Sequence, residues 1–287
     1  MTKEVIGDDS IRLADQTRRG SVAKFAACKR LWAEMLNNRE LIQVLIWRDV
    51  SVRYRQSALG YFWAVLPQLL TVSIFSFLVG QRALPIGVTP IPYPAYAIWS
   101  MTLWWLFAGT VSACTGSLVQ AGALVTRINF PKEAVVVAAI GQPLFDFIVR
   151  LAPVIAVFLW LGVIPPVTAW FVVVLVIPLV LMAIGFGFVF AIGNLVFRDV
   201  ANIVGIAATF GMFATPVLYP PPVSWPLRLV NVLNPFSPIL KATQDLLVYG
   251  EIKEPLALSI ACFFSAAVFL LGWKIFRVTL PRIIERA

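Results

Sequence analysis

Histidine does not occur anywhere in this sequence of 287 residues. The chain therefore lacks the commonest protein metal ligand and the usual general base near neutral pH. Its only cysteines, Cys28, Cys114 and Cys262, are scattered and form no C-x-x-C pair, so they indicate neither a disulfide framework nor a metal site. We accordingly predict no catalytic residue and no metal-binding residue.

Nucleotide-binding chemistry is missing as well. The sequence contains no G-x-x-x-x-G-K-[ST] phosphate loop, the motif with which such a chain would hydrolyse nucleotide by itself. Its only adjacent carboxylates, Asp8 and Asp9, lie in the polar N-terminal tail, so the acidic metal ligands expected of a membrane glycosyltransferase cannot be assembled. The sequence predicts a protein that is not an enzyme and binds no cofactor of its own.

Charge is scarce throughout the chain. Only 13% of the residues are charged and 60% are apolar, about half the usual charged share of a soluble domain. The uncharged runs suit helices that cross a bilayer, which need about 20 residues each. The sequence predicts an all-α integral membrane protein with six transmembrane helices, at Tyr61–Gly80, Ala95–Thr126, Ala134–Leu161, Val167–Phe197, Val200–Tyr219 and Pro255–Trp273.

The distribution of Lys and Arg predicts the orientation. With the N-terminus inside, the cytoplasmic side holds 11 of them in residues 1–59, two in residues 127–133, Arg198 and four after residue 273, 18 in total, against four outside. This bias follows the positive-inside rule, so both termini are expected in the cytoplasm. The net charge of +9 is then explained by topology, and no nucleic-acid partner is predicted.

The polar N-terminal region has two predicted parts. Residues 1–28 form a cytoplasmic tail that is expected to be disordered. Residues 29–59 place Leu41 and Leu45 on one side and Arg48, Asp49 and neighbouring arginines on the other, which is typical of an amphipathic helix lying on the membrane surface. An ordinary cytosolic helix is the alternative. Residues 60–276 are then the transmembrane domain, and residues 277–287 a cytoplasmic C-terminal tail.

Two segments between the predicted spans are unusual. The stretch "RINFPKE", residues 127–133, interrupts a long uncharged region, and it follows a predicted helix of 32 residues. Such a helix is about 48 Å long, against a hydrocarbon core of about 30 Å, so the stretch is expected at the tip of a long arm. Residues 220–254 are apolar but rich in proline, and we expect two short helices there, at 225–233 and 238–249, dipping into the outer leaflet.

Asp146 and Arg150 are the only ionisable residues deep within a predicted span. Their i, i+4 spacing places them on one face, where they can neutralise one another. A proton- or sodium-driven carrier usually needs more buried ionisable groups than one such pair.

Five motifs, in their order around the predicted spans, resemble those of ABC-2 type permeases that export polysaccharides, above all the O-antigen export permeases. They are "RDVSVRYRQSALGYFWAVLPQL" at 48–69, "INFPKE" at 128–133, "FRDVANIVG" at 197–205, "TPVLYP" at 215–220 and "LNPFSPILKATQDLLVYGE" at 233–251. The resemblance covers residues 30–276. It implies a homodimer in the cell inner membrane, bound to two copies of a separate ATPase that carries the ATP and Mg²⁺.

The resemblance also implies the cargo and the site residues. The cargo would be a polysaccharide on undecaprenyl diphosphate; capsule, teichoic acid, a non-glycan substrate and a membrane enzyme of glycan-lipid assembly remain as alternatives. ATPase coupling would involve Arg48, Asp49, Arg53, Arg55, Arg127, Asn129, Phe130, Pro131, Lys132 and Glu133. The substrate path would involve Asp146, Arg150, Trp63, Tyr219 and Trp225. Aromatic residues also belong at membrane interfaces, so packing or a lipid belt is the alternative for each, and a structural pair is the alternative for Asp146 and Arg150.

Overall fold

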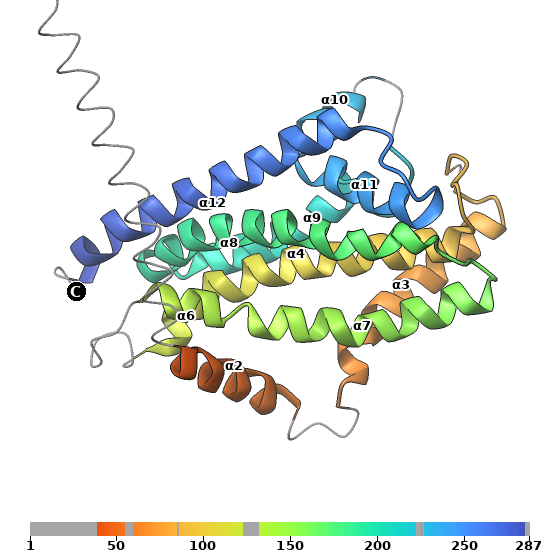
Figure 1. Ribbon diagram of the computed structural model, residues 1–287. Coiled ribbons are helices and arrows are strands. Elements are labelled where there is room, and N and C mark those ends of the chain that lie inside the picture. Colours follow the sequence, from red (N-terminus) through yellow and green to blue (C-terminus); the bar gives the residue numbers. More distant parts are fainter. Residues whose placement is uncertain are drawn as a thin grey trace, which may run out of the picture. The chain divides into compact units, whose positions relative to one another are not determined.

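The computed structural model describes residues 39–54, 60–84, 86–122, 132–221, 225 and 227–284. Every regular element in these ranges is a helix, which confirms the all-α prediction (Figure 1). The chain divides into two compact units, residues 1–44 and 45–287. The second unit holds the end of α2 and every later helix. The predicted tail, the first part of the predicted surface helix, Arg55 and residues 123–131 lie outside the described residues.

The helices follow one another along the chain with short connections. They are α2 (Arg39–Tyr54), α3 (Phe62–Gly80), α4 (Tyr93–Ala121), α6 (Glu133–Ala138), α7 (Gly141–Trp160), the 3₁₀ turn η1 (Val167–Phe171), α8 (Val172–Val196), α9 (Asp199–Ala214), α10 (Leu227–Leu233), α11 (Phe236–Val248) and α12 (Pro255–Ile284).

Among the described residues, five helical segments are long and apolar enough to cross a membrane: Phe62–Gly80, Tyr93–Ala121, Glu133–Trp160, Val167–Val196 and Pro255–Ile283. The remaining predicted span, Val200–Tyr219, is shorter than expected, because α9 ends at Ala214. At 16 residues, α9 is about 24 Å long. Thr215 is extended, with φ −102° and ψ 143°, as the residue before a proline tends to be. The sixth crossing therefore stays a prediction.

Two predicted boundaries are corrected by the structure. The last helix runs past Trp273 to Ile284, because Phe276 and Leu280 continue its buried face although charged residues appear beside them. The third predicted span is broken between α6 and α7. The break lies where Pro143, which has no N–H, cannot donate to the carbonyl four residues earlier.

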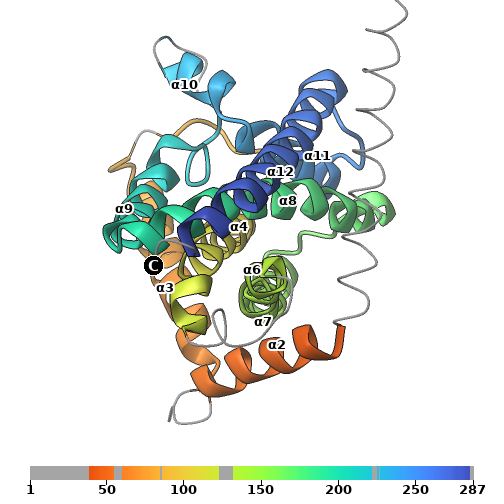
Figure 2. The same ribbon diagram turned by 90° about the vertical axis from the view of Figure 1, so that its left-hand side faces the viewer.

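The centre of the second unit is α4, which contacts α3, α7, α8, α9 and α11 (Figures 1 and 2). Most of its residues are buried, including hydroxyl-bearing ones. The hydroxyls of Ser100, Thr102 and Thr110 each donate to the carbonyl one turn earlier, at 2.7–2.8 Å. Each of these buried hydroxyls thereby has a hydrogen-bond partner within its own helix.

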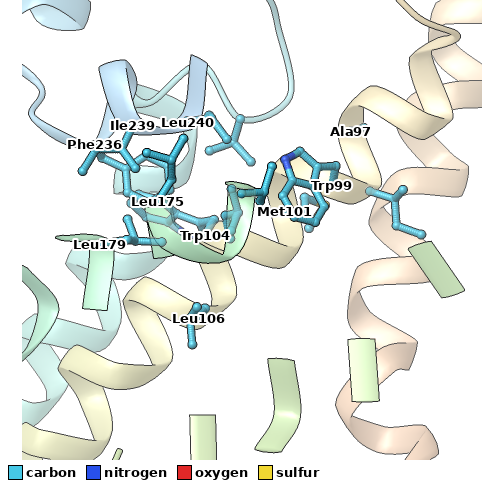
Figure 3. Packing of buried hydrophobic residues seen from close by; sticks show 14 of the residues in the cluster. Ala97, Trp99, Met101, Trp104, Leu106, Leu175, Leu179, Phe236, Ile239 and Leu240 are labelled. Atoms are coloured by element: carbon cyan, nitrogen blue, oxygen red, sulfur yellow. The ribbon is translucent and has the colours of Figure 1, made fainter. Parts of the chain in front are cut away.

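Aromatic packing joins α4 to the short helix α11 (Figure 3). The rings of Trp104 and Phe236 meet edge to face with centroids 5.2 Å apart, a favourable arrangement for aromatic pairs. The indole N–H of Trp99 donates to Thr243 at 3.1 Å. Leu175 and Leu179 of α8 complete this core, so α11 is anchored within the bundle.

The helices α8 and α12 approach at two glycines. A β-carbon on Gly272 would lie 2.1 Å from the Gly185 carbonyl oxygen, and one on Gly185 would lie 2.6 Å from the Val268 backbone. No real side chain tolerates such distances, so the two backbones are in direct contact. Small residues serve this role at helix interfaces in membranes, where close van der Waals packing drives association.

Gly272→Ala is therefore expected to destabilise the protein by about 3 kcal/mol, because the added methyl group must push α12 away from α8. The matched control is Gly205→Ala in α9, whose β-carbon would meet nothing within 4 Å. That change is expected to be neutral or slightly stabilising, since alanine favours a helix by roughly 0.5–1 kcal/mol over glycine. Thermal unfolding of both variants in one detergent measures the difference, and equal midpoints would contradict the close contact.

Candidate functional site

An elongated groove with a volume of about 470 Å³ lies between α4, α7 and α9. On α4 it extends from Trp104 to Gln120, which spans about 24 Å along the helix. The wall on α9 is lined by small or uncharged residues such as Gly205, Thr209 and Met212. Its shape suits an extended ligand better than a compact one.

The α7 wall of the groove is a polar stripe. Gln142, Asp146 and Arg150 line it, and their i, i+4, i+8 spacing puts all three on one face of the helix. Asp146 and Arg150 are only 5% and 8% exposed. The structure therefore brings together the two charged residues that the sequence had singled out for a substrate path, and it adds Gln142.

Arg150 ties three helices together. Its Nε donates to the Ala64 carbonyl of α3 at 3.0 Å. Its guanidinium carbon lies 5.4 Å from the centre of the Trp105 ring of α4, within the range of a cation–π interaction. A charge buried in a membrane helix needs such partners. Direct pairing of Asp146 with Arg150 stays a prediction from their spacing.

Two tryptophans form the aromatic part of the groove. Trp104 donates its indole N–H to the Ala208 carbonyl at 3.2 Å. Its ring also lies close to the backbone of α9, since a β-carbon added to Gly211 would be 3.1 Å from the ring. The indole N–H of Trp105 is buried without an acceptor among the described residues. A ligand with oxygen atoms in the groove could accept this hydrogen bond, because buried donors generally find a partner.

The composition of the groove indicates its chemistry. It combines aromatic rings with amide and hydroxyl groups, and it includes one acidic and one basic side chain, Asp146 and Arg150. Within the described ranges, no three metal-capable side chains gather anywhere. The arrangement fits a ligand rich in hydroxyl groups, which can stack on rings and exchange hydrogen bonds with amides.

On its other side, α9 borders an apolar groove. That groove has a volume of about 270 Å³ and is lined by α4, α8 and α9, with Trp104, Phe107 and Phe186 among its residues. The outward face of α9 is also apolar and exposed, with Ile203, Ile206, Phe210 and Phe213 between 50% and 69% exposed. This helix therefore needs lipid or another chain against it.

The described coupling candidates lie on α2 and at the beginning of α6. Arg48 and Asp49 of α2 pair at 2.8 Å on an exposed face, and Arg53 lies on the same helix. A β-carbon on Gly141 would be 2.4 Å from Ile46 of α2, so α2 contacts the first residue of α7. Lys132 is the N-cap of α6, and Glu133 is the first residue of that helix, which precedes α7.

The structure does not describe the other predicted coupling residues, which are Arg55, Arg127, Asn129, Phe130 and Pro131.

Three predicted path residues do not line the groove. Trp63 and Trp225 are 56% and 80% exposed. Tyr219, which follows the end of α9, donates its hydroxyl to the Phe213 carbonyl of that helix at 2.8 Å. Their role in a substrate path stays a prediction.

The family model and the similar known proteins point to the same family. Residues 40–248 match the model of the family described as ABC-2 type transporter. The O-antigen export system permease protein RfbA of Klebsiella pneumoniae is 26% identical over 244 residues, which cover 83% of this chain and 91% of that protein. Its namesake in Myxococcus xanthus is 26% identical over 253 residues, 84% and 92% of the two chains. The polysialic acid transport protein KpsM of Escherichia coli is 20% identical over 247 residues, 82% and 92%.

Proposed function

This chain belongs to the ABC-2 type transporter family, and we propose on that premise that it is the membrane permease subunit of an ATP-driven polysaccharide exporter. The observation that carries the proposal is the full-length similarity to permeases named for O-antigen export, which extends over 91–92% of two of them. The similarity to KpsM makes a capsule-type glycan the second candidate cargo.

We propose that the groove between α4, α7 and α9 is the part of the translocation path that one subunit contributes. Sugar rings present flat apolar faces and many hydroxyl groups, and Trp104, Trp105 and the amides of Gln120 and Gln142 offer partners to both. Weak, repeated contacts suit a polymer that must move on. We infer that the chain works as a homodimer, because a second copy placed against the exposed apolar face of α9 would both cover that face and enclose the groove.

Energy for transport would come from a separate ATPase chain. The sequence contains no phosphate loop, so ATP and Mg²⁺ would bind to the partner, in two copies for a homodimer. The proposed contacts are the stretch 127–133 and the α2 helix. Both lead to the start of α7, through Glu133 of α6 and through the contact of Ile46 with Gly141, and α7 carries the polar stripe of the groove.

The proposed topology has six crossings of the inner membrane, with both termini in the cytoplasm. One end of the bundle brings together α6 and the last turns of α12, where Glu133 pairs with Arg277. This end also carries Lys132, Lys274 and Arg282. Its positive charge supports a cytoplasmic location.

At the opposite end, α10 and α11 are the proposed helices that dip into the outer leaflet. Both short helices were predicted from the sequence, and α11 is largely buried. Burial raises the pKa of the Asp245 carboxyl, although the Lys253 N–H and the charges of Lys241 and Lys253 lower it. The Asp245 side chain is only 7% exposed, and it accepts a hydrogen bond from the Lys253 N–H at 3.3 Å, so α11 is held against the rest of the bundle.

Single cysteines placed along Trp225–Tyr249, in a background without other cysteines, test this arrangement. Reaction with an impermeant thiol reagent is expected to be fast on α10 and slow on the buried face of α11, and to change when ATP drives export. Uniform labelling that does not depend on ATP would indicate an ordinary surface loop instead.

The cargo lipid would be undecaprenyl diphosphate. The proposed function is tested by purifying the tagged protein from its own cells under mild conditions. An ATPase chain is expected to co-purify in a 1:1 ratio, and ATP hydrolysis by the complex is expected to rise when lipid-linked glycan is added. Isolation of the chain without any ATPase, under conditions that preserve other transporter complexes, would contradict it.

A further inference from the structure

An ion pair connects two distant parts of the sequence. Arg277 Nε of α12 donates to Glu133 Oε1 of α6 at 2.9 Å, across 144 residues of sequence. The Glu133 side chain is only 12% exposed and that of Arg277 is 36% exposed. The Arg277 guanidinium carbon also lies 5.2 Å from the centre of the Trp273 ring, which limits the directions it can take.

The α6 side of the pair is fixed in the core. Ala134 and Val136, which come after Glu133 in α6, are fully buried. The Cys114 thiol of α4 donates to the Val136 carbonyl at 3.4 Å. The Glu133 backbone is therefore held by the packing of α6 against α4.

The α12 side is equally well packed. Phe276, beside Arg277, is 1% exposed, and its ring centre is 5.0 Å from that of Phe188 in α8. One turn earlier, Gly272 touches the α8 backbone at Gly185. The pair thus joins two packed helices, and this distinguishes it from an exposed pair between two mobile side chains, which contributes little.

Glu133 is also the last residue of "RINFPKE", the stretch proposed to contact the ATPase. We propose that Arg277 is a positioning residue: it holds the C-terminal end of that stretch to α12, so that a movement imposed by the ATPase reaches α12 and α8 as well as α7. This inference rests on the proposed function. At the opposite end of α12, Glu254 pairs with Lys241 of α11, so α12 links the coupling end of the bundle to the outer short helices.

A role in stability alone is the competing explanation. Glu133 lies in the first turn of α6, where a negative charge is favourable with the helix dipole whether or not Arg277 is present. Stability can therefore be separated from coupling by measuring export per ATP hydrolysed, since a variant that is merely less stable loses hydrolysis and export in proportion.

The test compares four variants of the permease–ATPase complex: Arg277→Gln, Arg277→Lys, the exchange Glu133→Arg with Arg277→Glu, and the control Arg282→Gln, whose side chain is exposed on the same helix. Arg277→Gln is expected to retain ATPase binding and hydrolysis but to lower export per ATP about three- to tenfold, the range typical of residues that carry coupling. Arg277→Lys is expected to give an export per ATP between those of Arg277→Gln and the original protein. The exchange is expected to restore at least half of the export, and Arg282→Gln is expected to match the original protein.

Export per ATP unchanged in Arg277→Gln would overturn the inference, as would an equal loss of export and hydrolysis. If Arg277→Gln fails to accumulate, Arg277→Lys decides, because it leaves Glu133 unchanged: export per ATP below that of the original protein supports the inference, and unchanged export per ATP contradicts it. Failure of the unaltered chain to bind any ATPase would instead refute the proposed function, whatever the variants do.

Discussion

Replacing Arg150 by Gln alone is expected to destabilise the protein by about 3 kcal/mol and to abolish export. The Ala64 carbonyl would lose its donor from Arg150, and Trp105 would lose the cation above its ring. Asp146, which is 5% exposed, would remain as a buried charge without a positive neighbour one turn away. Leaving a buried charge without its counter-charge typically costs about 3–5 kcal/mol.

The double variant Asp146→Asn with Arg150→Gln separates two roles for this pair. No lone buried charge remains in it, so assembly with the ATPase is expected to recover, and stability to return to within about 2 kcal/mol, since the contacts with Ala64 and Trp105 are still lost. The contacts of Arg150 with α3 and α4 favour a structural role, and export is therefore expected to return to at least half of the original level. Recovery of assembly without export would show instead that Arg150 meets an anionic part of the cargo, such as a diphosphate.

Phe130→Ala is expected to weaken binding of the ATPase at least about 30-fold, because truncation of a buried aromatic anchor commonly costs about 2 kcal/mol or more. The argument comes from the sequence: an aromatic residue and a proline stand between Arg127 and Lys132, where a plain positive-inside loop needs neither. The length of α4 supports this docking role. Its 29 residues give a helix of about 44 Å, which is longer than the hydrocarbon core and can hold the stretch beyond the membrane surface.

The matched control for this change is Lys132→Ala, which removes a charge from the same stretch. Rim charges contribute little, so its effect on binding is expected to stay within about fivefold. Titration of the purified ATPase onto permease in nanodiscs measures both constants. Equal affinities for Phe130→Ala and the original protein would refute the docking role.

The sequence predicts the fold class well because lipid imposes a simple rule on composition. Uncharged runs of about 20 residues identified the five long helices. The rule fails where a helix end depends on local chemistry: Pro216 ends α9 early, and Phe276 and Leu280 extend α12 beyond its first charges.

The candidate site is predictable only in part. Asp146 and Arg150 stand out because charge inside a span is rare. Gln142 could have been added from its position one turn before Asp146. Trp104 and Trp105 could not be chosen from ten tryptophans, since each also fits a lipid interface or a core. The pairing of Glu133 with Arg277 depends on the packing of both α6 and α12 against α8, which no local spacing reveals.

Transfer of a glycan across the membrane is the central claim, and its direct measure is the sidedness of lipid-linked polysaccharide in cells that lack this chain. We expect such cells to synthesise the glycan but to retain it inside, where an externally added glycan-specific lectin or antibody reaches it only after the membrane is opened. The original chain should restore surface labelling, and the chain with Phe130→Ala should not. Undiminished surface glycan without the chain would contradict the account, and so would loss of glycan synthesis itself, which would point to an enzyme of glycan assembly.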